Sequence, residues 1–142
     1  MKISSKGRYA IESLIYLATL PNAPTQVKDI AKKTDIPQKY LEQIFFALRQ
    51  ANILAAKRGP SGGYYFQKSP QELTVGDIIR ILEGEIIAVD CLQDKSACIT
   101  MQLYESCITR ALWQDISSTI SDIMDSTTIA ALAFQLQGGM GL

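Results

Sequence analysis

Residues 34–66 read TDIPQKYLEQIFFALRQANILAAKRGPSGGYYF, and this stretch holds the strongest indications of how the chain folds. Residues 34–37 have the composition of a turn, and Pro37 suits the first position of a helix over about residues 37–51. Apolar residues recur along that helix at three- and four-residue steps, which predicts one buried face. The residues predicted to be buried are Leu41, Ile44, Phe45 and Leu48.

A β-hairpin is predicted directly after this helix. Residues 53–58 and 64–66 favour extended structure, and the glycines and proline between them favour a tight turn. Before the helix, apolar spacing predicts one helix over residues 7–20 and a second, short one that Thr25 caps. Two helices, a turn, a third helix and a hairpin make a winged helix-turn-helix, which is the predicted fold of residues 1–84.

The chain after the hairpin is predicted to begin with another helix. Thr74 and Asp77 have the spacing of a capping box, with aspartate in place of the usual glutamate. The helix they open ends at Gly84, a residue type common at helix ends. Its apolar residues are Ile78, Ile81 and Leu82.

The last third of the chain combines an irregular segment with a long helix. Residues 85–107 carry all three cysteines and are predicted to form a loop. Residues 101–128 return to helical spacing, with an apolar ladder of Leu112, Ile116, Ile120 and Ile123. Residues 129–142 are predicted to be a C-terminal tail with a frayed, glycine-rich end. The predicted fold class is mainly α with a small β-hairpin wing.

Composition excludes several classes of protein. The chain has 142 residues, 47% of them apolar, which is enough to bury a core. It contains no run of the ~18 apolar residues that cross a membrane, and charges interrupt any signal peptide. We therefore expect a cytoplasmic protein without membrane association. Because the chain has no histidine, catalysis by Ser-His-Asp or Cys-His groups is excluded, and no enzyme activity is expected.

The charges are divided unequally between the two halves. Residues 1–68 hold eleven lysines and arginines against four acidic residues, a net of +7, and residues 69–142 have a net of −7. This asymmetry predicts that the first half binds a polyanion. The alternative is that both halves are ordinary solvated surface.

The helix over residues 37–51 and the hairpin tip are the predicted DNA contacts. A helix of this kind enters the major groove, where glutamine pairs with adenine, glutamate with cytosine, and lysine with guanine or phosphate. A cation on a thin loop fits the minor groove or the flanking phosphates of double-stranded DNA. The helix contacts would be Gln38, Lys39, Tyr40, Glu42 and Gln43, and the hairpin contacts Lys57, Arg58, Gly59 and Pro60.

Several motifs occur in an order that resembles one known family. They are MKISSKGRYA at residues 1–10, YLEQ at 40–43, LRQA at 48–51, RGPSGGY at 58–64, and TVGDIIR at 74–80 followed by LEG. The chain is similar in these motifs to the Rrf-two family of bacterial winged-helix regulators, closely over about residues 1–90 and more loosely beyond. The resemblance implies a homodimeric transcription factor, most often a repressor, whose long C-terminal helix pairs with its twin while two recognition helices read a palindromic operator.

The cysteines are candidate ligands of an iron–sulfur cluster. Thiolates are soft ligands, and cytoplasmic thiols stay reduced. Cluster-binding members of the resembling family carry three cysteines in this segment, which implies a 2Fe–2S or 4Fe–4S cluster on Cys91, Cys98 and Cys107. The intervals here are longer than in the family pattern, and the fourth ligand is open. Some members take it from the first helix of the partner subunit, where Glu12 lies, and a backbone group, a small thiol or water are alternatives.

Other roles for the cysteines stay open at this stage. The simplest interpretation is that the thiols are buried or incidental and bind nothing. A structural zinc site is another interpretation. Within the same family, a cluster-free regulator would respond to thiol oxidation, to a small effector or to a partner protein.

Overall fold

The computed structural model describes residues 2–97 and 107–140. Its elements follow the order α1, α2, α3, β1, β2, α4, two short 3₁₀ helices, α5 and α6. The elements of the first half are α1 Ser5–Thr19, α2 Val27–Thr34, α3 Gln38–Gln50, β1 Leu54–Lys57 and β2 Gly63–Phe66. The elements of the second half are α4 Val75–Glu83, η1 Asp90–Leu92, η2 Lys95–Ala97, α5 Arg110–Ser126 and α6 Ile129–Met140.

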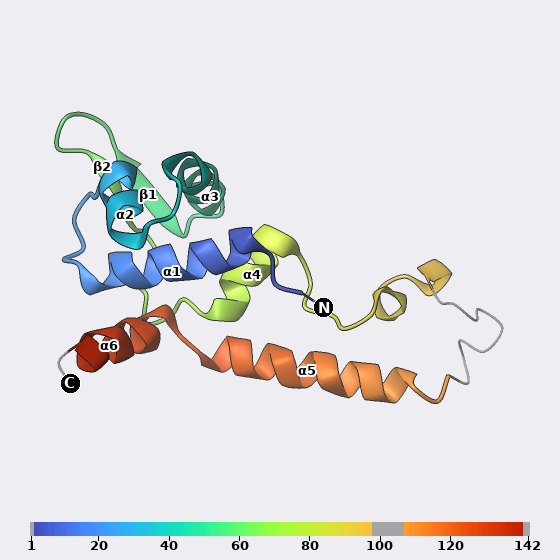
Figure 1. Cartoon of the computed structure of the whole chain (residues 1–142). Coiled ribbons are helices and arrows are strands. Elements are labelled where there is room, and N and C mark those ends of the chain that lie inside the picture. The colour runs from blue at the N-terminus through green and yellow to red at the C-terminus, as the bar shows by residue number, and fades with distance from the viewer. Residues whose placement is uncertain (1, 98–106, 141–142) are drawn as a thin grey trace.

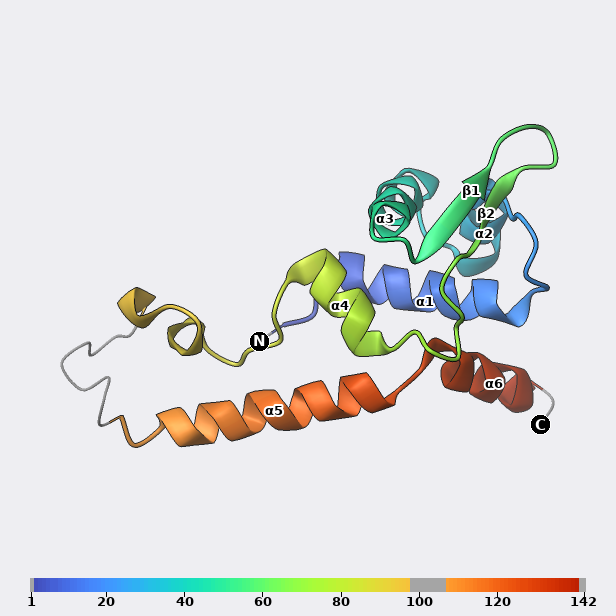
Figure 2. The same cartoon turned by 180° about the vertical axis from the view of Figure 1, so that it is seen from behind.

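The winged helix-turn-helix is confirmed. Helices α2 and α3 and the hairpin lie on one side of α1, and α5 and α6 lie on the other (Figures 1 and 2). Strands β1 and β2 pair antiparallel, with Leu54 opposite Phe66 and Lys57 opposite Gly63. The whole predicted face of α3 is fully buried against α1 and α2.

Two predicted helix starts are wrong by a residue. Gln26, not Thr25, precedes α2, because the Thr25 backbone is already bonded to Tyr64 and its hydroxyl donates to the Ala23 carbonyl. Pro37 is the N-cap of α3 and not its first helical residue.

The predicted capping box of α4 is confirmed. The Asp77 N–H donates to Thr74 Oγ1, and the Thr74 N–H donates to Asp77 Oδ2, each at 3.1 Å. Gly84 ends the helix at a φ of 87°, a left-handed conformation that favours glycine. Ile81, predicted to lie on the apolar face, is exposed, and Ile79 is buried in its place.

The structure differs from the prediction in two further segments. Residues 129–140 form helix α6 where a tail was predicted, because Ile129 and Ala133 bury against the core beside α1. The Ile129 N–H also donates to the Leu73 carbonyl at 2.9 Å. The long helix was predicted from residue 101, but α5 begins at Arg110, and residues 98–106 lie outside the described residues.

Candidate nucleic-acid interface

The predicted base-reading residues share the exposed face of α3. The side chains of all five are exposed, opposite the buried face of the helix. Gln38 Nε2 donates to Glu42 Oε1 at 3.1 Å, so these two side chains are already held together before any ligand arrives. The members of this surface, which we call the reading face, are Gln38, Lys39, Tyr40, Glu42 and Gln43.

Tyr40 also helps to hold α3 in place. Its ring meets the ring of Tyr9 on α1 edge to face, with centroids 5.5 Å apart and an angle of 86° between the planes. This is a favourable geometry for an aromatic pair. Tyr40 nevertheless remains 43% exposed, so its outer edge can still contact a ligand.

The predicted wing contacts lie at the tip of the hairpin. Lys57 ends β1, and Arg58, Gly59 and Pro60 follow in the turn, all exposed. Gly59 has a φ of 106°, which a side chain would strain. The Gly62 N–H closes the turn on the Gly59 carbonyl at 2.9 Å, which leaves the two cations projecting on a narrow loop.

The wing is anchored to the start of α2. Thr25 and Tyr64 exchange backbone hydrogen bonds of 2.9 and 2.8 Å, and Gln26 Nε2 donates to the Pro60 carbonyl at 3.1 Å. A Cβ on Gly63 would overlap the Thr25 backbone, so the close approach requires glycine. Gln26 was not predicted to belong to the interface, because no local signal links residues 34 positions apart.

Phe46 is a second exposed residue of this surface that was not predicted. It belongs to α3 and is 58% exposed, although its neighbour Phe45 is fully buried. Helical spacing could have revealed it, because Phe46 comes four residues after Glu42 and three after Gln43. Phe46 therefore places a large apolar side chain beside the reading face.

The cysteine segment lies beside α5. Cys91 is in η1, Cys107 comes shortly before α5, and Cys98 lies outside the described residues. The Ala88 N–H donates to Ser117 Oγ at 2.8 Å, and η1 contacts α5, so the segment starts along the middle of that helix. The 3₁₀ helices and the first turns of α5 project to the same end of the molecule (Figure 1).

The two described thiols suit a soft metal ligand set. Both are partly exposed and free. Cys107 Sγ lies 3.4 Å from Thr109 Oγ1, and this hydrogen bond, helped by the backbone N–H groups of Thr109 and Arg110, lowers the pKa of the Cys107 thiol. A lowered pKa favours the thiolate, which is the form that binds metals.

The described residues do not by themselves assemble a complete metal site. Across residues 2–97 and 107–140, no three cysteine, aspartate or glutamate side chains gather closely enough to hold an ion. Glu12 is exposed on α1. A full set of ligands would therefore need Cys98, and any use of Glu12 stays a prediction.

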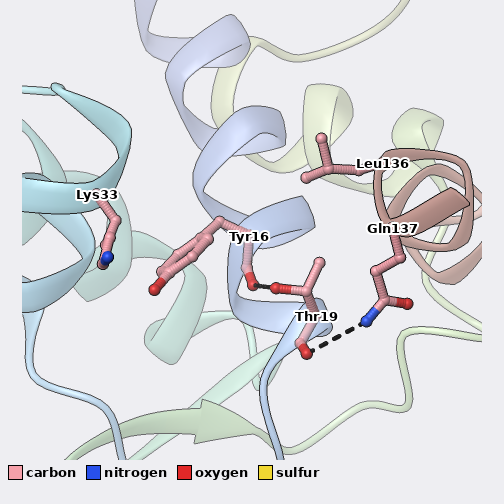
Figure 3. Close-up of a pocket in the computed structure, with 5 residues that line it drawn as sticks. All are labelled: Tyr16, Thr19, Lys33, Leu136 and Gln137. Carbon is pink, nitrogen blue, oxygen red and sulfur yellow. Dashed lines mark hydrogen bonds between the residues drawn. The ribbon is translucent and has the colours of Figure 1, made fainter. Parts of the chain in front are cut away.

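A cavity of about 560 Å³ lies apart from the reading face, between α1, α2 and α6. Figure 3 shows Tyr16 and Lys33 pointing toward one another from α1 and α2. Gln137 Nε2, from α6, donates to the Thr19 carbonyl at 3.5 Å. Together with Leu136, these residues give the cavity a phenol, an ammonium group and an apolar wall.

The fold and the reading face define a winged-helix transcriptional regulator. The family model described as an iron-dependent transcriptional regulator, Rrf2, matches residues 3–135, and the chain belongs to this Rrf2 (Rrf-two) family. Its relatives are named as transcriptional regulators, which agrees with the expectation that it is not an enzyme.

Relatives of two kinds are similar to nearly the whole chain. The regulator CymR of Bacillus subtilis is 39% identical over 97% of this chain and 94% of its own, and its structure, titled the global cysteine regulator, superposes with a TM-score of 0.77. The regulator IscR of Erwinia tasmaniensis is 37% identical over 93% of this chain and 78% of its own. The structure of T. potens IscR covers 96% of this chain and 88% of its own, at 30% identity and a TM-score of 0.76.

Within the part of the chain that the structure describes, none of the helices combines the length and the apolar character needed to cross a bilayer.

Proposed function

We propose that this chain is a repressor that binds a palindromic operator as a homodimer, with α3 in the major groove and the wing on the flanking DNA. The observation that carries the proposal is the common placement of α3, which carries the exposed reading face, and of the wing on the side of α1 opposite α5 and α6 (Figures 1 and 2). Exposed Lys28 and Lys32 on α2 add cations near them for phosphate contacts.

The two exposed ends of the apolar ladder on α5 support the homodimer. Leu112 is 51% exposed and Ile123 is 62% exposed, so neither is buried within the subunit. Apolar side chains at helical spacing on a long exposed helix favour a partner helix of the same kind. Replacing both by aspartate should convert a dimer into a monomer in sedimentation, whereas a chain that sediments as a monomer before any substitution would contradict the homodimer.

The DNA proposal is tested by selection of binding sites from random duplexes. We expect the purified chain to enrich a palindromic site, and the Arg58→Ala variant to bind that site more weakly. Enrichment of no sequence, with the chain folded by circular dichroism, would overturn the proposal. A chain that binds the selected site but does not repress a reporter gene placed behind it would overturn only the repressor assignment.

We further propose that an iron–sulfur cluster held by Cys91, Cys98 and Cys107 controls the DNA affinity. The support is the thiolate-favouring position of Cys107, the accessibility of Cys91, and the similarity to IscR. A bound cluster would supply a redox-sensitive link between the cysteines. Residues 85–107 connect α4 to α5, so a cluster that linked the cysteines would change how the two recognition helices are spaced. A coupling of ~1–3 kcal/mol changes affinity ~5–150-fold.

The cluster is tested on protein purified without oxygen. We expect visible absorption with iron and sulfide both present, and loss of both in Cys91→Ala, Cys98→Ala and Cys107→Ala but not in Ser96→Ala, a control in the same segment. Protein that stays colourless after anaerobic reconstitution would overturn the cluster. Zinc bound tightly in air would indicate a structural zinc site.

A cluster-free regulator that responds to a small effector is the alternative, and the cavity between α1, α2 and α6 supports it. Lys33 and the Tyr16 hydroxyl would suit the negative group of a small effector, and the cavity connects α6 to the helix-turn-helix (Figure 3). The similarity to CymR also fits this version. Operator affinity that responds to small organic anions in wild type but not in Lys33→Ala, with no iron bound, would favour it.

A further inference from the structure

Phe46 is exposed where the proposed function requires a base-reading surface. At ~100° per residue, its direction on α3 lies about 40° from that of Glu42 and about 60° from that of Gln43. The adjacent Phe45 packs edge to face on Tyr64, with ring centroids 5.3 Å apart, and belongs to the core. Phe46 points away from that core and is 58% exposed, so it adds little to folding.

The neighbours of Phe46 make it an isolated apolar group on a polar face. Lys39, Glu42, Gln43 and Gln50 surround it on α3, and all are exposed. Such a setting does not suit the core of a protein–protein interface, which is depleted of charged residues. It does suit the major groove, where polar groups read base edges and the one apolar group on offer is the 5-methyl of thymine.

We propose that Phe46 is a specificity-determining residue that contacts a thymine methyl group in each half-site. This inference rests on the proposed function, because it requires α3 to lie in the major groove. The interval between Glu42 and Phe46 on α3 predicts where this thymine lies in the operator. Four residues of helix advance about 6 Å, so Phe46 reaches about two base pairs beyond the position that Glu42 reads.

The experiment exchanges single thymines of the selected operator for deoxyuridine, which removes only the methyl group. The position read by Glu42 is located first, as the one whose base preference changes in Glu42→Ala. We expect deoxyuridine about two base pairs from it to weaken wild-type binding about fourfold per half-site, since burying one methyl group contributes about 0.8 kcal/mol. Phe46→Ala should bind the thymine and deoxyuridine operators equally.

The outcomes separate this inference from the proposed function. If wild type enriches no operator, the proposed function fails. If wild type binds its operator but Phe46→Ala keeps the same sensitivity to deoxyuridine, the contact does not exist and only the role of Phe46 is overturned. A Phe46→Ala protein that changes its sedimentation would likewise overturn it, by assigning the side chain to a protein interface.

Discussion

Arg80 and Asp125 form a two-pronged ion pair that joins α4 to α5. Arg80 Nη1 donates to Asp125 Oδ1 at 2.6 Å, and Nη2 donates to Oδ2 at 2.9 Å. Helix α4 packs on α1 and α3, so this pair connects the proposed dimer helix to the unit that carries the reading face. Parallel hydrogen bonds between guanidinium and carboxylate fix direction as well as distance.

The first prediction concerns pH. The hydrogen bonds from Arg80 lower the pKa of Asp125 below its ordinary value of 3.8. A lowered pKa in the folded state stabilises the fold above the unfolded pKa, and this contribution is lost as the pH falls through the folded value. The melting temperature of Asp125→Asn should therefore lie slightly below that of wild type at neutral pH, and the gap should close in acid.

The control for this pH effect is Asp122→Asn, an exposed aspartate on the same helix. It should leave the melting temperature close to that of wild type throughout. A gap for Asp125→Asn that is constant with pH would show that the ion pair is not its cause.

The second prediction concerns Gly76, which leaves room for the ion pair. A Cβ at this position would overlap Oδ1 of Asp125 and approach Arg80 Nη1 to 2.9 Å. Alanine normally stabilises a helix relative to glycine by about 1 kcal/mol. The overlapping atom is the end of an exposed side chain, so Gly76→Ala should displace Asp125 and lose an ion pair that contributes up to about 1 kcal/mol. The free energy of unfolding in urea titrations should therefore not show the gain expected for alanine in a helix.

Gly138 provides the matched comparison. It also lies in a helix, but a Cβ there would meet nothing within 4 Å. Gly138→Ala should be neutral or stabilising. If both alanine variants stabilise the chain equally, the space at Gly76 has no role in the ion pair.

The third prediction concerns the charge of the wing. Arg58→Ala should weaken operator binding and reduce the slope of log affinity against log salt by about one, because one phosphate contact is lost. Lys95→Ala removes a positive charge far along the chain and should leave the slope unchanged. Fluorescence anisotropy at several salt concentrations measures this slope. A slope for Arg58→Ala equal to that of wild type would exclude a phosphate contact by Arg58.

The fourth prediction concerns the wing anchor. Gln26→Ala removes the hydrogen bond to the Pro60 carbonyl without changing any charge. We expect operator affinity to fall several-fold, since a net hydrogen bond contributes about 0.5–1.5 kcal/mol, while the salt slope stays as in wild type. Gln67→Ala, which changes an exposed glutamine at the base of the hairpin, serves as the control. Equal affinity of the Gln26 and control variants would show that the wing needs no anchor.

Local patterns predicted much of the DNA-binding half. The buried face of α3 followed from helical spacing, and the capping box of Thr74 and Asp77 from two residues three apart. The start of α2 was missed by one residue, because the Thr25 backbone pairs with Tyr64 across the fold. Bonds between distant segments leave no trace in local spacing.

The same reason explains the errors in the C-terminal half. Helix α6 was taken for a tail, because its stability comes from burial of Ile129 beside α1 and from a bond to Leu73. The pair of Arg80 with Asp125 links residues 45 positions apart and could not be predicted. Phe46, by contrast, could have been placed beside the reading face from spacing alone.

The most direct test of a dimer that reads DNA with α3 and the wing is a hydroxyl-radical footprint on the selected operator. We expect two symmetric protected regions whose centres are about 10 base pairs, or a multiple of that, apart. Flanking protection should be reduced in Arg58→Ala, while the centres stay in place. A single protected region without symmetry, or a footprint that Arg58→Ala leaves unchanged, would contradict the account.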